Sequence, residues 1–123
     1  MQWRDGHDQR LDKMENIIRG TALEVADRDG ASVDFSKMHG LKPVQMDQSL
    51  QDILRNAAEN ACPNRWRNIQ SGALHDAANV AKLMPAAMLF VPSIEGISHD
   101  FSEDTNEQDL IDGLTVLAKA FLD

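Results

Sequence analysis

The sequence has little cysteine, few aromatic residues and no long apolar run. It contains one cysteine, Cys62, and aromatic side chains make up 5% of its 123 residues. A single cysteine forms no internal disulfide and excludes a cysteine-based zinc cluster, which fits a reducing compartment. No apolar run approaches the roughly 20 residues that a membrane-spanning helix needs, and the opening MQWRDGHDQR lacks the apolar centre of a secretory signal. We therefore expect a cytoplasmic protein with no membrane partner.

Positive charge is also scarce. Twelve Lys and Arg stand against 20 Asp and Glu, so the net charge is −8 at pH 7. An acidic chain repels phosphate backbones, and we expect no nucleic-acid partner. Apolar residues make up 42% and charged residues 26% of the chain. These are globular proportions, and the length suits one ordinary domain or parts of two.

The chain contains patterns typical of both helices and strands. Apolar residues at three- and four-residue steps predict helices over residues 8–30, 47–62, 71–84 and 105–121. Alternating or continuous apolar residues predict strands over residues 31–40, 65–70 and 86–92. Strands that alternate with helices predict an α/β fold. Pro43 marks the best internal boundary, because the pattern before it differs from the alternating pattern after it.

Several residues predict where these helices begin and end. Asp8 and Asp47 are expected to cap the first and second helices, and Gly30 is expected to end the first. Thr105 and Gln108 have the spacing of a capping box at the start of the last helix. That helix is expected to bury one apolar face, made of Leu110, Ile111, Leu114, Leu117, Ala118 and Phe121.

Two loops follow predicted strands and carry candidate functional residues. SGALHD contains Gly72 and His75, and SIEGISHD contains His99. In an open α/β sheet, ligands bind at the carboxyl ends of strands, where Gly permits close backbone approach and His can bind a metal or an anion. The alternatives are a capping or packed role for His75, a solvated loop position for His99, and a surface charge for Arg4.

Three ordered motifs resemble a known family. Residues 71–77 read SGALHDA, residues 90–93 read FVPS, and residues 96–99 read GISH, with Glu103 four residues later. Together they resemble the C-terminal end of the M20-type zinc amidohydrolases, which include allantoate amidohydrolases, N-carbamoyl-L-amino acid hydrolases and β-ureidopropionases. One departure is Leu74, which stands where the family has a second glycine and fills space near the substrate.

The resemblance implies a fold and roles for particular residues. Residues 1–42 would be the second half of an α+β lid and dimerisation domain, and residues 43–123 the C-terminal part of an α/β catalytic domain. His99 would be a ligand of a two-zinc site. Arg4 would bind a substrate carboxylate, while Gly72 and His75 would contact a small ureido or carbamoyl substrate.

The remaining zinc ligands and the general base of that family come from an N-terminal half that this sequence does not contain. No complete catalytic set is present, since none of His7, His39, His75 and His99 is followed by Asp two positions later. The two-zinc site is therefore expected to be incomplete, and the chain inactive alone. Its partner would be an N-terminal half or, in a homodimer, a second copy. The alternatives are a non-catalytic self-associating or partner-binding α/β module, and an α/β domain that only shares ancestry with the family.

Overall fold

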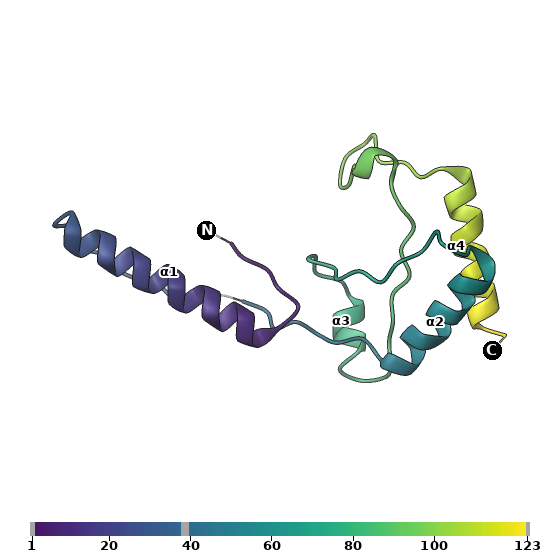
Figure 1. Cartoon of the computed structure of the whole chain (residues 1–123), viewed down its shortest axis with the longest axis horizontal. Coiled ribbons are helices and arrows are strands. Elements are labelled where there is room, and N and C mark those ends of the chain that lie inside the picture. The colour runs from purple at the N-terminus through teal and green to yellow at the C-terminus, as the bar shows by residue number, and fades with distance from the viewer. Residues whose placement is uncertain (1, 38–39, 123) are drawn as a thin grey trace. The chain divides into compact units, whose positions relative to one another are not determined.

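The computed structural model describes residues 2–37 and 40–122 of the chain (Figure 1). It contains α1 (Asp8–Arg28), α2 (Gln48–Ala61), α3 (Ala77–Val80), the 3-10 helix η1 (Ile94–Gly96) and α4 (Glu107–Ala120). The chain divides into two compact units. The first comprises Met1–Val44 and Gln70–Leu74, and the second comprises Gln45–Ile69 and His75–Asp123.

The predicted α/β fold is wrong for the part of the chain that the structure describes. Residues 31–37, 65–70 and 86–92 form no strand, and residues 38 and 39, with His39, lie outside the described residues. An apolar pattern reports which side chains avoid water, whereas a strand also requires a neighbouring backbone to pair with. One backbone hydrogen bond lies at each end of the third segment. The Asp47 N–H donates to the O of Ala86, its first residue (2.8 Å), and just beyond its other end the Ile94 N–H donates to Asp104 O (2.8 Å).

The first unit is organised around α1. The helix begins at Asp8, with His7 at its N-cap and no side-chain cap, so the predicted Asp8 cap is wrong. At its other end Gly30 has a φ of 66°. The Gly30 N–H donates to Asp27 O (3.3 Å) and the Ala31 N–H donates to Ala26 O (2.8 Å). This is a Schellman motif, and it confirms Gly30 as the helix-ending residue.

The chain after this turn runs back along α1. The Arg19 guanidinium lies 4.7 Å from the centre of the Phe35 ring, a cation–π distance. An open apolar groove of about 510 Å³ is lined by Ile17, Ile18, Thr21, Ala22, Val25, Ala26, Ala31, Ser32 and Val33. Packing in the first unit is therefore shallow, and no residue of α1 is fully buried.

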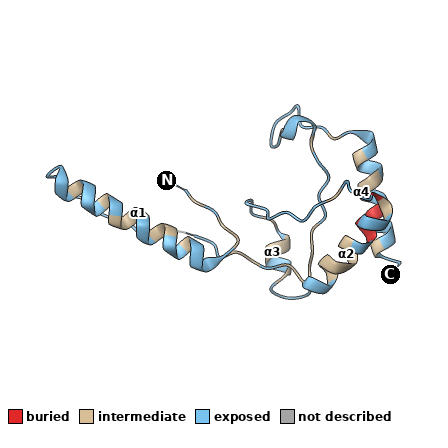
Figure 2. Cartoon of the chain, in the orientation of Figure 1, coloured by how far each residue is buried: buried red, intermediate tan, exposed pale blue. Residues whose placement is uncertain are grey.

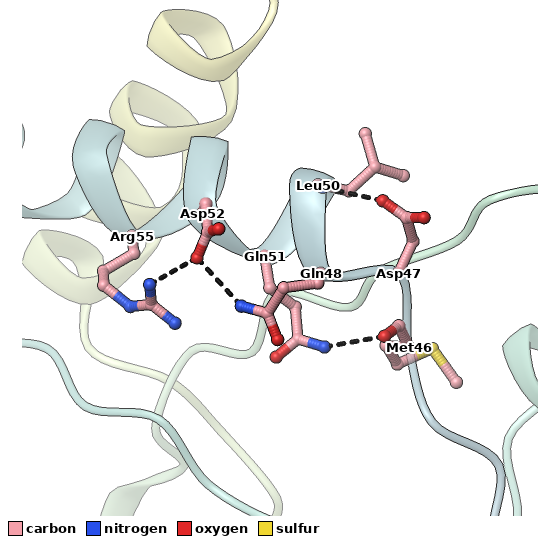
Figure 3. Close-up of polar contacts among 7 residues, drawn as sticks. All are labelled: Met46, Asp47, Gln48, Leu50, Gln51, Asp52 and Arg55. Atoms are coloured by element: carbon pink, nitrogen blue, oxygen red, sulfur yellow. Dashed lines mark hydrogen bonds and ion pairs between the residues drawn. The ribbon is translucent and has the colours of Figure 1, made fainter.

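The second unit is built on the contact between α2 and α4 (Figure 2). Its buried residues are Ala57, Ala58, Cys62 and Val116. Asp47 caps α2 as predicted, because its Oδ1 accepts the Leu50 N–H (2.9 Å; Figure 3). The helix ends at Ala61, two residues before Pro63. Local signals thus place α2 correctly.

The last helix differs from its prediction in two ways. Its N-cap is Asn106, with no side-chain cap bond, so the capping box at Thr105 and Gln108 is wrong. Val116 is 3% exposed, whereas Leu114, from the predicted core face, is 69% exposed. The face that meets α2 carries small side chains, which permit close approach, and the wider apolar face lies outside that contact.

The third helical prediction is only partly right. Of residues 71–84, α3 includes Ala77–Val80 alone. Within the described ranges, no helix is both long enough and apolar enough to span a bilayer.

Candidate functional site

Arg4 and Gly72 lie together in the first unit. They are 68 positions apart, yet Arg4 Nη1 donates to Gly72 O at 2.6 Å. Arg4 Nη2 also donates to Gln2 Oε1 at 3.4 Å. Both acceptors are neutral, so these contacts orient the guanidinium without neutralising its charge.

The nearest acidic residue in sequence is engaged elsewhere. Asp5 Oδ1 accepts the His7 N–H (2.9 Å), and Asp5 Oδ2 lies 3.6 Å from Arg10 Nη1. Over residues 2–37 and 40–122, Arg4 itself makes no ion pair. The exposed guanidinium therefore presents a positive charge and further N–H donors, which suit a carboxylate ligand.

The Gln70–Leu74 loop is shaped by local contacts. Ser71 Oγ accepts the Ala73 N–H (3.2 Å), a side-chain turn that bends the backbone at Gly72. At the base of the loop, a Cβ on Gly6 would lie 2.9 Å from Gln70 Cδ, so the end of the Gln70 side chain would have to shift to accept a larger residue there. Leu74, at the end of the same loop, is 76% exposed.

His75 belongs to the second unit and precedes α3. Its ring centre lies 5.3 Å from that of Phe90, at an interplanar angle of 53°. The imidazole is half-buried, and its ring packing against an aromatic side chain fits the packed alternative as well as a substrate contact. Phe90 appears in the FVPS motif, but nothing in the sequence predicted this ring contact.

His99 lies in a loop with an uncommon backbone. Its φ is 60°, and Glu95 (56°) and Gly96 (70°) nearby are also in the left-handed region. The backbone N–H of His99 donates to Glu103 Oε2 at 2.6 Å. Sequence reasoning noted the four-residue spacing of this pair but not the contact.

The turn after His99 is also hydrogen-bonded. The Ser102 hydroxyl donates to Asp100 Oδ1 (2.7 Å), as does the Ser102 N–H (2.9 Å). These bonds, the hydroxyl first and the backbone second, lower the pKa of Asp100 from its ordinary value.

The described residues do not fit a complete zinc site. No group of three or more His, Cys, Asp or Glu side chains that could hold a metal occurs in residues 2–37 and 40–122. A catalytic zinc needs about three protein ligands. His99 offers a single imidazole, and Cys62 is buried as a free thiol in the α2–α4 core. No catalytic step through a metal follows from this chain alone.

Comparison with known proteins agrees with the sequence motifs. Residues 5–123 match the profile of peptidase family M20/M25/M40. The chain is 34% identical over 116 residues to N-carbamoyl-L-amino-acid amidohydrolase of Paenarthrobacter aurescens, covering 94% of this chain and 28% of the relative. It is 36% identical over 106 residues to allantoate amidohydrolase of Escherichia coli (strain K12), covering 86% and 25%.

A solved structure is similar as well. The crystal structure of an amidase of the hydantoinase/carbamoylase family from Burkholderia phymatum superposes with a TM-score of 0.78 at 36% identity, covering 95% of this chain and 28% of that chain. The resemblance found in the sequence is thereby confirmed. The chain spans about a quarter of the length of the curated relatives it matches.

Proposed function

This chain belongs to peptidase family M20/M25/M40, and from that membership we propose that it forms the C-terminal part of a metal-dependent amidohydrolase. The enzyme would hydrolyse a C–N bond of a small ureido, carbamoyl or allantoate-like substrate. The names of two relatives support this substrate class. Residues 1–42 would form half of a lid domain, and residues 43–123 the end of the catalytic domain.

The observation that carries the proposal is the pairing of Arg4 with Gly72. The resemblance assigns both residues to the substrate, and both lie in the same compact unit. The Gly72 carbonyl orients the guanidinium, whose remaining N–H groups would bind the substrate carboxylate in a bidentate manner. Leu74, exposed in the same loop, would narrow the space available to the substrate side chain.

The two histidines would have different tasks. His75, held against Phe90, would be a polar contact to the substrate. His99 would supply one ligand to a zinc site whose other ligands lie outside this sequence. The chain alone would then be inactive, and it would gain activity on association with an N-terminal part. We also propose a cytoplasmic location, which the free thiol of Cys62 supports.

Hydrolysis of an N-carbamoyl-L-amino acid and of allantoate tests this function. The chain would be assayed alone and together with the N-terminal part of an M20 amidohydrolase. Arg4→Lys in the active assembly is expected to raise KM about tenfold or more, because one bidentate, charge-assisted contact is lost. Arg67→Lys, at an exposed arginine of the second unit, is the control. An unchanged KM in Arg4→Lys would remove Arg4 from the substrate site.

A second candidate function is a non-catalytic module that associates with itself or with another protein. The exposed apolar residues of α4 and its C-cap favour it: Leu110, Ile111, Leu114 and Leu117 in the helix, and Phe121 at the C-cap. Such a surface would be covered by a second copy in a homodimer or by an N-terminal part. Sedimentation equilibrium and the hydrolysis assay together distinguish the two functions. A stable homodimer that gains no activity when an N-terminal part is added favours the module.

A further inference from the structure

The loop that carries His99 is closed at its base by a backbone bond. The Ile94 N–H donates to Asp104 O at 2.8 Å, so the two ends of the loop formed by residues 94–104 lie next to each other. One turn lies on each side of His99. In the first, the Ile97 N–H donates to Ile94 O (3.1 Å), and in the second, the Glu103 N–H donates to Asp100 O (3.0 Å).

His99 connects these two turns in a backbone conformation that is uncommon for any residue other than glycine. At a φ of 60°, the Cβ of an L-residue crowds its own backbone, and only glycine adopts this region freely. A residue in this region persists when its surroundings determine its conformation. The backbone N–H of His99 therefore matters, because its bonding partner decides whether the left-handed conformation is retained.

That partner is the Glu103 side chain. Its Oε2 accepts the His99 N–H at 2.6 Å, which is short for a bond from a backbone N–H to an oxygen. Glu103 lies before α4, which begins at Glu107, so its carboxylate is not one of the helix's first-turn acids. The Glu103 backbone is in turn fixed by its own bond to Asp100 O.

We propose that Glu103 is a positioning residue for His99. Its carboxylate holds the His99 backbone in the left-handed region, and this backbone sets the direction in which the imidazole leaves the loop. The functional meaning of this device rests on the proposed function, in which His99 is a metal ligand. The geometry itself needs no metal and is measurable on the chain alone.

The test is hydrogen exchange and nuclear Overhauser spectroscopy of the whole, metal-free chain. In the parent, the His99 amide is expected to exchange slowly and to show a strong cross-peak to its own Hα, because a φ near +60° brings these protons together. Glu103→Ala is expected to accelerate His99 amide exchange about tenfold or more, the effect of losing a charge-assisted hydrogen bond, and to weaken the cross-peak. The residues beside His99 are unchanged, so its intrinsic exchange rate is unchanged.

Two further variants make the result specific. Glu103→Gln keeps an acceptor oxygen at the same reach and is expected to retain part of the protection; it also serves if the alanine variant is unfolded. Glu95→Ala removes a carboxylate from the same loop and is expected to leave His99 unaltered. The inference is overturned if Glu103→Ala, or Glu103→Gln in its place, leaves both the exchange rate and the cross-peak of His99 at parental values.

The proposed function fails on a different result. If zinc retention by the assembled enzyme is insensitive to His99→Ala, His99 is no metal ligand, even where Glu103 controls its backbone.

Discussion

Gly113→Ala tests how closely α4 packs against Val91. A Cβ at position 113 would lie 2.5 Å from Val91 Cγ1, well inside the roughly 3.5–4.0 Å of a favourable carbon–carbon contact. Alanine is better than glycine inside a helix by about 1 kcal/mol. The β-branched Val91 cannot rotate away easily, and overpacking costs about 1–3 kcal/mol. We therefore expect a net destabilisation of about 1 kcal/mol, with an upper limit near 2.

Urea unfolding followed by circular dichroism at 222 nm measures this change. Gly20→Ala is the matched control, because Gly20 lies inside α1 and a Cβ there would meet no atom within 4 Å beyond its own stretch of helix. It is expected to stabilise by about 0.5–1 kcal/mol. A double variant with Val91→Ala should show coupling to Gly113→Ala and none to Gly20→Ala. If Gly113→Ala stabilises as much as Gly20→Ala, the close packing of α4 on Val91 is refuted.

Three further changes test other contacts. Asp47→Ala removes the side-chain cap of α2 and is expected to cost about 1 kcal/mol in urea unfolding, whereas Asp47→Asn should cost little. The pKa of Asp52 is lowered by its hydrogen bonds with Gln48 and then Arg55 (Figure 3). The contribution of ionised Asp52 to folding stability is therefore present above its ordinary pKa of 3.8 and is lost as the pH falls through the lower folded-state pKa. The difference in the free energy of unfolding between the parent and Asp52→Asn should accordingly close in acid. Leu114→Glu charges the exposed face of α4 and is expected to shift sedimentation equilibrium toward the 13.7 kDa monomer; a parent that is monomeric at all concentrations would contradict this surface's role in association.

Helix ends were predictable where the signal is local. Gly30 ends α1 because a left-handed residue is required there, and Asp47 caps α2 because its side chain reaches a backbone N–H three residues on. Neither depends on distant parts of the chain. Thr105 had equally suitable neighbours, yet α4 begins one residue later than that spacing required, with Asn106 at its N-cap.

The strands and the buried face of α4 were not predictable in the same way. An apolar run such as residues 86–92 indicates side chains that avoid water, but the pairing backbone must come from elsewhere. In α4, the contact with α2 selected Val116 over the more numerous leucines, because small neighbours such as Ala57 and Ala58 allow the helix axes to approach. The period of apolar residues does not encode which face finds a partner.

In the candidate site, too, contacts between distant residues could not be predicted from the sequence. Spacing alone could not pair Arg4 with Gly72 across 68 positions; both were proposed through the family resemblance, and the structure shows their hydrogen bond. The hydrogen bond between Glu103 and His99 spans four residues. Many side chains can reach the backbone over that distance, so the sequence alone could not predict which one does.

Zinc content tests the central claim most directly, namely that His99 supplies one ligand to a site completed from outside this sequence. Metal would be measured after dialysis for the chain alone and for its assembly with the N-terminal part of an M20 amidohydrolase. The account predicts no stoichiometric zinc in the chain alone, retained zinc in the assembly, and loss of that zinc in His99→Ala. One or two tightly held zinc ions in the chain alone, or undiminished zinc in the His99→Ala assembly, would contradict it.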